Sequence, residues 1–337
     1  MKEYCFREEP FEIYGIPLFK ESGMLERLPA SVREQLPSLK DLGRRCPGAR
    51  LRFRTNSKRI SLCVKFENLT PDVGMSLMSA QSANVFAGPM QSADYIGLIR
   101  PVNYYTAEAA GEVKKSARME DITIFLPRNE VITDIIIGLE DDAYLEPPTP
   151  YRYSLPILYY GSSITEGGCC SKPANAYNAF ISRWLDTDYY NFGFSGSARG
   201  ELAMADYINT IPKSILVMDY DHNSPSAEHL QQTHEPFFKR IREHDSELPV
   251  VLLTRPNFDY GDAPIRREII RKTYQNAVEK NDKNVYFIDG EMLFGTDNRD
   301  ACTADTIHPN DLGMYRMAKC ICPVIQKILT KQNQKNE

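Results

Sequence analysis

The first part of the chain shows short runs in which apolar and polar residues alternate. The runs 49–55 and 60–66 are separated by turn-forming residues at 56–58, and this spacing predicts a β-hairpin with one buried face. The runs 122–126 and 131–139 repeat the pattern around a second turn. Because little else is helical here apart from residues 31–42, the pattern predicts an antiparallel β-sandwich of jelly-roll type.

The second part of the chain alternates strands and helices instead. Its strand-length runs, such as Ile215–Met218 and Val250–Leu253, are continuously apolar, as is typical of parallel strands covered by helices on both faces. The pattern predicts strands at 155–160, 188–192, 214–219, 249–254 and 284–289, and helices at about 176–186, 199–210, 227–244, 263–280 and 311–330. The expected fold is an α/β domain with a parallel sheet.

A proline-rich segment separates the two patterns. Pro147-Pro148-Thr149-Pro150 is stiff and cannot continue a central strand or a helix. We therefore expect an accessory β-sandwich domain over residues 1–148 and an α/β domain over residues 149–337.

Composition and charge exclude several classes of function. The 337 residues include 42% hydrophobic and 25% charged residues, which is typical of a globular protein. The net charge of −5 comes from 40 basic and 45 acidic residues mixed along the chain, so neither nucleic acid nor an anionic membrane is an expected partner. No secretory signal and no membrane-spanning segment is recognisable, and the expected location is cytoplasmic.

Metal and cofactor motifs are missing from the sequence. The eight cysteines are scattered or adjacent, there are five histidines, and neither Cys-x-x-Cys nor His-Glu-x-x-His occurs. Reduced thiols are the expectation for a chain of this length without an export signal. Dinucleotide and Walker motifs are also missing, so we expect no metal and no cofactor.

A serine stands where an apolar strand ends. The run Leu155–Tyr160 leads to Gly161-Ser162-Ser163, and a rigid strand end followed by a tight turn is the placement that a nucleophile requires. The same stretch is equally compatible with an ordinary turn and a helix N-cap. Asp305-Thr306-Ile307-His308 favours the first interpretation, since a carboxylate three residues before a histidine can orient its imidazole as a base.

Four blocks of sequence together resemble the SGNH (GDSL-like) hydrolases. The first block is Gly161–Thr165 and the last is Asp305–Pro309. Between them, Asn191–Gly196 resembles the glycine block and Asp219–Asn223 the asparagine block. One departure is Ser162, which stands where the family usually has an aspartate. That aspartate is not a triad member, so the change concerns the support of the turn.

The resemblance implies a flavodoxin-like three-layer domain and a role for each block. Ser163 would attack an ester carbonyl, with His308 as general base and acid and Asp305 orienting the imidazole. The oxyanion hole would consist of the backbone N–H groups of Ser163 and Gly196 and the side-chain amide of Asn223. The glycine and asparagine blocks each follow a predicted strand, so they should meet Ser163 at one edge of the sheet.

Two further residues are candidates for the substrate site. Arg199 follows the glycine block, and His222 precedes Asn223, where we interpret it as a wall of the site rather than as a second base. The histidines at 229, 234 and 244 fall in the predicted helix 227–244, where solvated positions are expected.

The resemblance also suggests a substrate. Members with an N-terminal β-sandwich are commonly esterases that remove O-acetyl groups from plant-type oligosaccharides, and this is the leading hypothesis. A general short-chain acyl esterase or lysophospholipase-like enzyme would share every catalytic residue. An inactive carbohydrate-binding protein is a third hypothesis, and the complete residue set argues against it. The accessory domain could contribute a loop over the site, bind sugar, add stability or form the surface of a homo-oligomer.

Overall fold

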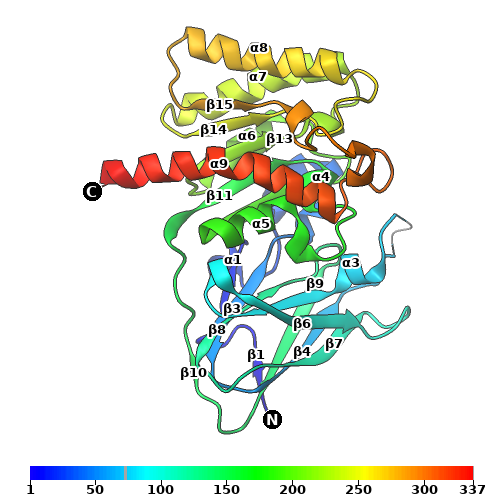
Figure 1. Cartoon of the computed structure of the whole chain (residues 1–337), viewed down its shortest axis with the longest axis vertical. Coiled ribbons are helices and arrows are strands. Elements are labelled where there is room, and N and C mark those ends of the chain that lie inside the picture. The colour runs from blue at the N-terminus through cyan, green and yellow to red at the C-terminus, as the bar shows by residue number, and fades with distance from the viewer. Residues whose placement is uncertain (72–73, 337) are drawn as a thin grey trace.

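A computed structural model describes residues 1–71 and 74–336, so Glu337, the last residue of the second predicted domain, lies outside the described part. The strands lie in two sheets, one in the lower and one in the upper half of Figure 1. The chain leaves the first sheet after β10 (Leu145–Glu146) and joins the second at β11 (Tyr153–Gly161). The proline-rich segment connects these two strands.

The first sheet is antiparallel and curled. Within the described residues its strands follow the order β1-β9-β4-β7-β6-β5-β8-β3-β10, with β2 paired to β3. These strands are β1 (Lys2–Cys5), β2 (Glu12–Tyr14), β3 (Arg50–Thr55), β4 (Arg59–Phe66), β5 (Ala83–Ala87), β6 (Asp94–Pro101), β7 (Glu108–Lys114), β8 (Glu120–Phe125) and β9 (Ile132–Leu139). Alternate side chains from both halves of the curl pack into one apolar core, which includes Leu51, Val64, Ile124 and Ile137.

The strands of the predicted hairpin are present, but their pairing differs from the prediction. β3 pairs with β2, β8 and β10, whereas β4 pairs with β7 and β9. The turn after β3 therefore carries the chain from one half of the curl to the other. The connection from β8 to β9 does the same, because β8 pairs with β3 and β5 and β9 with β1 and β4.

The first domain also contains short helices. They are α1 (Phe19–Ser22), α2 (Ala30–Gln35) and α3 (Leu77–Gln81). The predicted helix over 31–42 is shorter than expected because Pro37 follows the end of α2, and only single 3-10 turns continue the segment. Leu28, Val32 and Leu39 pack against the second domain rather than into the first core.

The second sheet is parallel, as predicted. Its order is β12-β11-β13-β14-β15 within the described residues. The remaining bounds are β12 (Thr187–Gly193), β13 (Ile215–Asp219), β14 (Val250–Leu253) and β15 (Val285–Ile288). Each agrees with the predicted strand to within one or two residues. The predicted fold class, an antiparallel β domain before an α/β domain with a parallel sheet, is confirmed.

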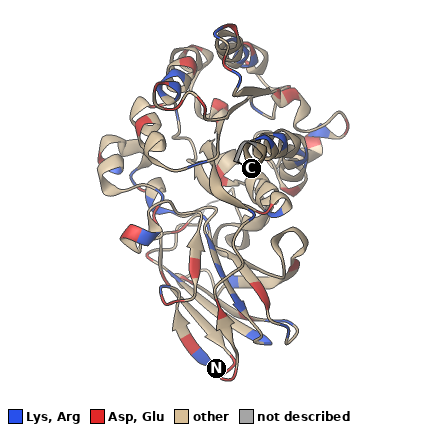
Figure 2. Ribbon diagram, turned by 90° about the vertical axis from the view of Figure 1, so that its left-hand side faces the viewer, with Lys and Arg blue, Asp and Glu red and all other residues tan. Residues whose placement is uncertain are grey.

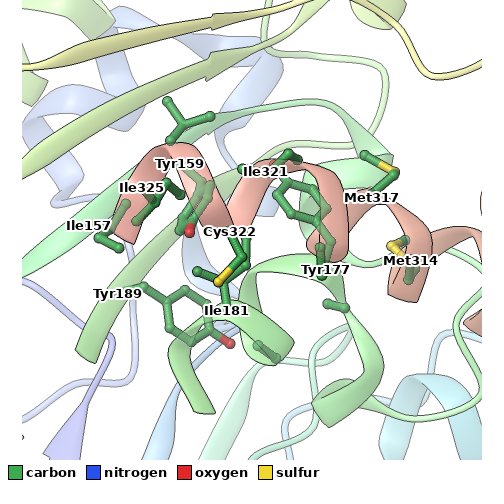
Figure 3. Close-up of a cluster of buried hydrophobic side chains, with 14 of the residues drawn as sticks. Ile157, Tyr159, Tyr177, Ile181, Tyr189, Met314, Met317, Ile321, Cys322 and Ile325 are labelled. Atoms are coloured by element: carbon green, nitrogen blue, oxygen red, sulfur yellow. The ribbon is translucent and has the colours of Figure 1, made fainter. Parts of the chain in front are cut away.

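Helices cover both faces of this sheet. They are α4 (Ser163–Glu166), α5 (Tyr177–Leu185), α6 (Leu202–Thr210), α7 (Ala227–His244), α8 (Ala263–Glu279) and α9 (Asp311–Asn336). Ile157 and Tyr159 of β11 face α5 and α9, as Figure 3 shows, while Leu158 and Tyr160 face the layer of α6, α7 and α8. Alternate residues of one strand thus fill two cores, which explains why the strand is apolar throughout.

One predicted surface histidine is buried. His234 of α7 is 1% exposed, its Nδ1 lies 2.9 Å from Thr273 Oγ1 of α8, and its ring stacks on Tyr220. Burial lowers the pKa of His234 to about 3, so the ring is neutral. The expectation of a solvated helix position was wrong here because the residue lies between two packed helices.

Charged side chains of both signs are interspersed over both domains (Figure 2). None of the helices in the described part is long and apolar enough to cross a membrane.

Candidate active site

The predicted catalytic residues lie within hydrogen-bonding distance of one another at the C-terminal edge of the parallel sheet. Ser163 is the first residue of α4, directly after β11, and its Oγ lies 2.8 Å from His308 Nε2. His308 Nδ1 lies 2.6 Å from Asp305 Oδ2. These distances are those of strong hydrogen bonds, and the order hydroxyl–imidazole–carboxylate is the arrangement that activates a serine.

The local sequence explains how Ser163 is held. Ser162 caps α4 by accepting a hydrogen bond from the Ile164 N–H at 3.2 Å. Gly161 is required because a Cβ there would lie 2.0 Å from Thr165 Oγ1. Ser162, which replaces the family's usual aspartate, therefore serves the turn through a neutral cap.

Asp305 is fixed by its own loop. Its Oδ1 accepts the backbone N–H groups of Ile307 at 3.0 Å and His308 at 2.7 Å, which leaves Oδ2 for the imidazole. Partial burial acts to raise the pKa of Asp305, but these hydrogen bonds and the imidazole outweigh it and hold the pKa below its usual value. The carboxylate stays charged and favours the tautomer that carries its proton on Nδ1. Nε2 is then free to accept the proton of the Ser163 hydroxyl.

Thr306 makes this loop unusual. It has a φ of +69°, a left-handed conformation that a β-branched residue rarely adopts. This conformation accompanies the turn in which Asp305 accepts two successive backbone amides.

The predicted oxyanion residues also come together. Gly196 has a φ of +65° and donates its N–H to Asn223 Oδ1 at 3.1 Å, while Asn223 Nδ2 donates to Phe194 O at 2.8 Å. These two backbone partners fix which way the Asn223 amide points. The second hydrogen on Nδ2 stays available, and so does the N–H of Ser163, which as the first residue of a helix has no partner within it.

Gly196 differs from the prediction in one respect. Its N–H is occupied by Asn223 Oδ1, so in this structure it orients the asparagine instead of pointing freely at the site. Its missing Cβ would meet nothing within 4 Å, so glycine is needed for the positive φ rather than for close packing.

The two weaker candidates have different surroundings. The guanidinium of Arg199 is exposed and donates to Gly196 O from Nε at 3.3 Å and Nη2 at 3.0 Å, so it braces the glycine block. His222 has a buried Nε2 without a partner among the described residues. Burial, followed by the neighbouring Arg255 and His308, lowers the pKa of His222 well below its usual value. Burial thus favours the neutral imidazole, and the interpretation of His222 as a wall of the site rather than a second base stays a prediction.

A buried ionic cluster behind Asn223 was not anticipated. Asp221 accepts the Arg255 N–H at 3.0 Å, and Arg266 Nη1 lies 3.0 Å from Asp221 O. Asp262 binds Arg266 Nε at 2.7 Å. Burial raises the pKa of Asp221 although both arginines act against this. The cluster fixes the 3-10 turn that carries Asn223, and the pair at 262 and 266 is visible in the sequence as i and i+4.

A second buried carboxylate lies beneath the nucleophile. Asp219 Oδ2 accepts hydrogen bonds from Thr165 Oγ1 and from the Tyr177 hydroxyl, both at 2.8 Å, and Asp219 O accepts the Ser162 N–H at 3.3 Å. Burial raises the pKa of Asp219 to about 7. Asp219 thus ties β13 to the nucleophile turn.

The first domain contributes to the site from behind. Arg27 is fully buried, donates to the carbonyl oxygens of Asn191 and Gly193, and stacks on Phe194 with 4.3 Å from Cζ to the ring centre. Burial lowers the pKa of Arg27 to about 10. Glu166 lies 3.9 Å from Arg27 and accepts the Ser195 N–H at 3.0 Å. Nothing in the sequence distinguishes Arg27 from a surface arginine.

No group of three or more potential metal ligands comes together within the described residues. The arrangement at the sheet edge needs none, because a serine, an oriented imidazole and two N–H donors suffice for acyl transfer from an ester.

A serine, a histidine and a carboxylate arranged in this way on a parallel sheet covered by helices are typical of a serine hydrolase. Comparisons of the sequence identify its family. The model of the GDSL-like lipase/acylhydrolase family matches residues 154–326, and that of the N-terminus of SGNH-hydrolase-type esterases matches residues 4–145. The chain belongs to the GDSL-like lipase/acylhydrolase family, with the N-terminal domain typical of SGNH-type esterases, and by family it is a carboxylic ester hydrolase. No curated protein matches the chain.

Solved structures share the two-domain fold. A protein from Bacteroides ovatus ATCC 8483 that is considered a GDSL-like lipase is 23% identical, with a TM-score of 0.87 over 98% of both chains. A salicylyl-acyltransferase from a tetracycline biosynthetic pathway is 18% identical, with a TM-score of 0.77 over 97% of both chains. A family two carbohydrate esterase from Clostridium thermocellum, solved with cellohexaose, is 14% identical, with a TM-score of 0.61 over 84% of this chain and 93% of that one.

Proposed function

We propose that the protein is a serine esterase that removes O-acetyl groups from oligosaccharides. The observation that carries the proposal is the open and polar setting of the triad. The side chains of Asp305 and His308 are 49% and 28% exposed, so a bulky hydrophilic alcohol can approach the base that must protonate it. A long acyl chain would require an apolar channel instead.

The mechanism assigns one step to each residue. Ser163 Oγ attacks the acetyl carbonyl while His308 Nε2 takes its proton, and the same imidazole then protonates the departing sugar hydroxyl. The oxyanion is held by the Ser163 N–H and the Asn223 amide. Water deprotonated by His308 releases acetate. The cellohexaose bound to the Clostridium thermocellum esterase supports a sugar substrate for this fold by analogy alone.

The location belongs to the same proposal. We place the enzyme in the cytoplasm, which makes imported oligosaccharides rather than intact polymer the substrate. Acetate release from lysates fractionated into cytosol and exterior tests this assignment.

An acyl-chain series separates the proposed function from its rivals. Wild type should hydrolyse 4-nitrophenyl acetate faster than the butyrate and the octanoate, and should release acetate from acetylated xylan or mannan oligosaccharides, with Ser163→Ala as the blank. Preference for octanoate would favour a lysophospholipase-like enzyme. Activity on nitrophenyl esters without any on sugar esters would leave a general short-chain esterase. Oligosaccharide binding without activity on any ester would indicate a binding protein.

A further inference from the structure

A cavity of about 260 Å³ adjoins the catalytic loop. It is lined by the loops that follow β14 and β15, at the same edge of the parallel sheet as Ser163. In Figure 1 this edge lies on the right-hand side, where α4 and the start of α9 are drawn. One wall includes Thr303 and Thr306, and Thr306 directly follows Asp305 in the sequence. The cavity therefore borders the loop that carries Asp305 and His308.

A larger cavity lies elsewhere. It has a volume of about 390 Å³ and is lined by the C-terminal parts of α7 and α8 and by residues up to Asn284, just before β15 begins. That position is the opposite edge of the sheet, so this cavity cannot hold a part of a substrate bound at Ser163.

The chemistry of the smaller cavity selects its ligand. Its wall carries one exposed aromatic ring, Tyr260, which is 56% exposed, and its apolar floor is the buried Phe294. The rest of the lining consists of amide, hydroxyl and charged side chains from Asn257, Asp259, Arg299, Asp300, Thr303 and Thr306. A flat ring with hydrogen-bonding groups around it suits a sugar, which has apolar C–H faces and a rim of hydroxyls.

Charge argues against an anionic ligand. Among the lining residues Arg299 carries the positive charge; its Nε binds Asp259 Oδ2 at 2.8 Å and its Nη1 binds Glu291 O at 2.7 Å, while its buried Nη2 has no partner among the described residues and can donate to a hydroxyl group. Asp300 adds a further negative charge to the wall. A phosphate or carboxylate would meet more negative than positive charge here, whereas neutral hydroxyl groups find both donors and acceptors. The Arg299–Asp259 pair also ties the two loops together across the cavity.

We propose that this cavity is a subsite for a sugar ring of the oligosaccharide whose ester is cleaved, with Tyr260 as the stacking platform and Asn257 and Thr306 as hydrogen-bonding partners. The inference rests on the proposed function and deepens it. It assigns recognition of the sugar to the β14 and β15 loops of the catalytic domain and not to the accessory domain.

Substrate discrimination tests the subsite. For each variant, kcat/KM is measured with an acetylated oligosaccharide and with 4-nitrophenyl acetate, and the ratio of the two is compared. Tyr260→Ala should lower this ratio by roughly tenfold or more, since a stacking surface is lost only for the larger substrate. Tyr260→Phe should keep most of the ratio because the ring remains. Tyr144→Ala, at a 71% exposed tyrosine of the first domain, is the matched control.

A binding measurement gives an independent readout. Calorimetric titration of Ser163→Ala with the unacetylated oligosaccharide should show binding that Tyr260→Ala weakens and that choline does not compete away. A ratio that Tyr260→Ala leaves unchanged, with sugar esters still cleaved, would overturn the subsite while the proposed function stands. Competition by choline would assign the cavity to a cation instead. Absence of acetate release by wild type from every sugar ester tested would overturn the proposed function, and the subsite with it.

Discussion

The two ends of the catalytic hydrogen-bond chain are supported in different ways. Ser163 stands on buried groups from distant parts of the sequence, with Asp219 beneath its turn and Arg27 of the first domain behind the neighbouring glycine block. The imidazole of His308 is oriented by Asp305, three residues away, in an exposed loop. The nucleophile is thus placed by the folding of both domains, and the base by a local turn. The end formed by Asp305 and His308 is exposed, so a substrate can approach it.

The largest effect on activity should come from a change in the Asp305–His308 loop. Asp305→Asn removes the carboxylate that selects the imidazole tautomer, so kcat on 4-nitrophenyl acetate should fall by about 10⁴-fold. Asp297→Asn, at an exposed carboxylate in the same region, is the control and should stay close to wild type. Comparable activity of the two variants would show that the loop does not orient the base through Asp305.

The next largest effect concerns the buried end at Ser163, where a change at Arg27 should lower the free energy of unfolding. Arg27→Met leaves Glu166 buried without its cation and several carbonyl oxygens without a donor, so the free energy of unfolding should fall by about 3–5 kcal/mol. Arg54→Met breaks a surface ion pair with Glu146, where about 1 kcal/mol or less is expected. Denaturant titration compares them. Equal losses would mean that the contact from the first domain does not stabilise the glycine block.

Asn223 belongs to the buried end of the site, and we propose that it acts in the reaction as an oxyanion donor. Asn223→Ala should lower kcat about 10²–10³-fold with little change in KM, because an oxyanion donor acts mainly in the transition state. Asn209→Ala, near the end of α6, provides a control of the same type. A loss confined to KM would assign Asn223 to substrate binding.

The pH dependence of stability sharpens the comparison further. Asp219 has a pKa of about 7 in the folded protein, above the ordinary value of 3.8, so the folded state binds more protons between these pH values. Stability should therefore fall as pH rises from about 4 to 7 and level off above, a loss of roughly 4 kcal/mol from this group.

Asp219→Asn should flatten this part of the profile, because the amide does not titrate. Urea titrations of both proteins at pH 5 and pH 8 give the comparison. A wild-type profile that rises over this range, or an equally steep fall in the variant, would contradict the assignment.

The sequence predicted the second domain well and the first only in part. Continuous apolar runs such as that of β13 define parallel strands within a residue or two, because burial on both faces leaves no polar positions. In β3 and β4 the alternation identified the strands but not their partners. Alternation of apolar and polar residues shows only that one face of a strand is buried. It is the same whether the next strand in the sequence pairs with this strand or lies across the core. Pairing is decided by long-range contacts that a local pattern does not contain.

The candidate site shows the same division. Ser163, Gly196, Asn223, Asp305 and His308 could be named because they lie in sequence blocks. The structure joins Ser163 to His308 and His308 to Asp305, and it joins Gly196 to Asn223, while their catalytic roles stay predictions. Arg27 and Arg255 were missed, since a buried arginine has the same local sequence signature as an exposed one. The state of Gly196 was also beyond prediction, because only the folded geometry shows that its N–H binds Asn223 Oδ1.

The most direct test of the account compares two adjacent serines. Ser163→Ala and Ser162→Ala are assayed on 4-nitrophenyl acetate, and the wild-type protein is treated with a fluorophosphonate and mapped by peptide mass spectrometry. The account predicts that Ser163→Ala loses activity by about 10⁴-fold or more, that Ser162→Ala loses only the part due to a weakened helix cap, and that the label sits on Ser163. Activity that survives in Ser163→Ala, or a label on Ser162, would contradict it.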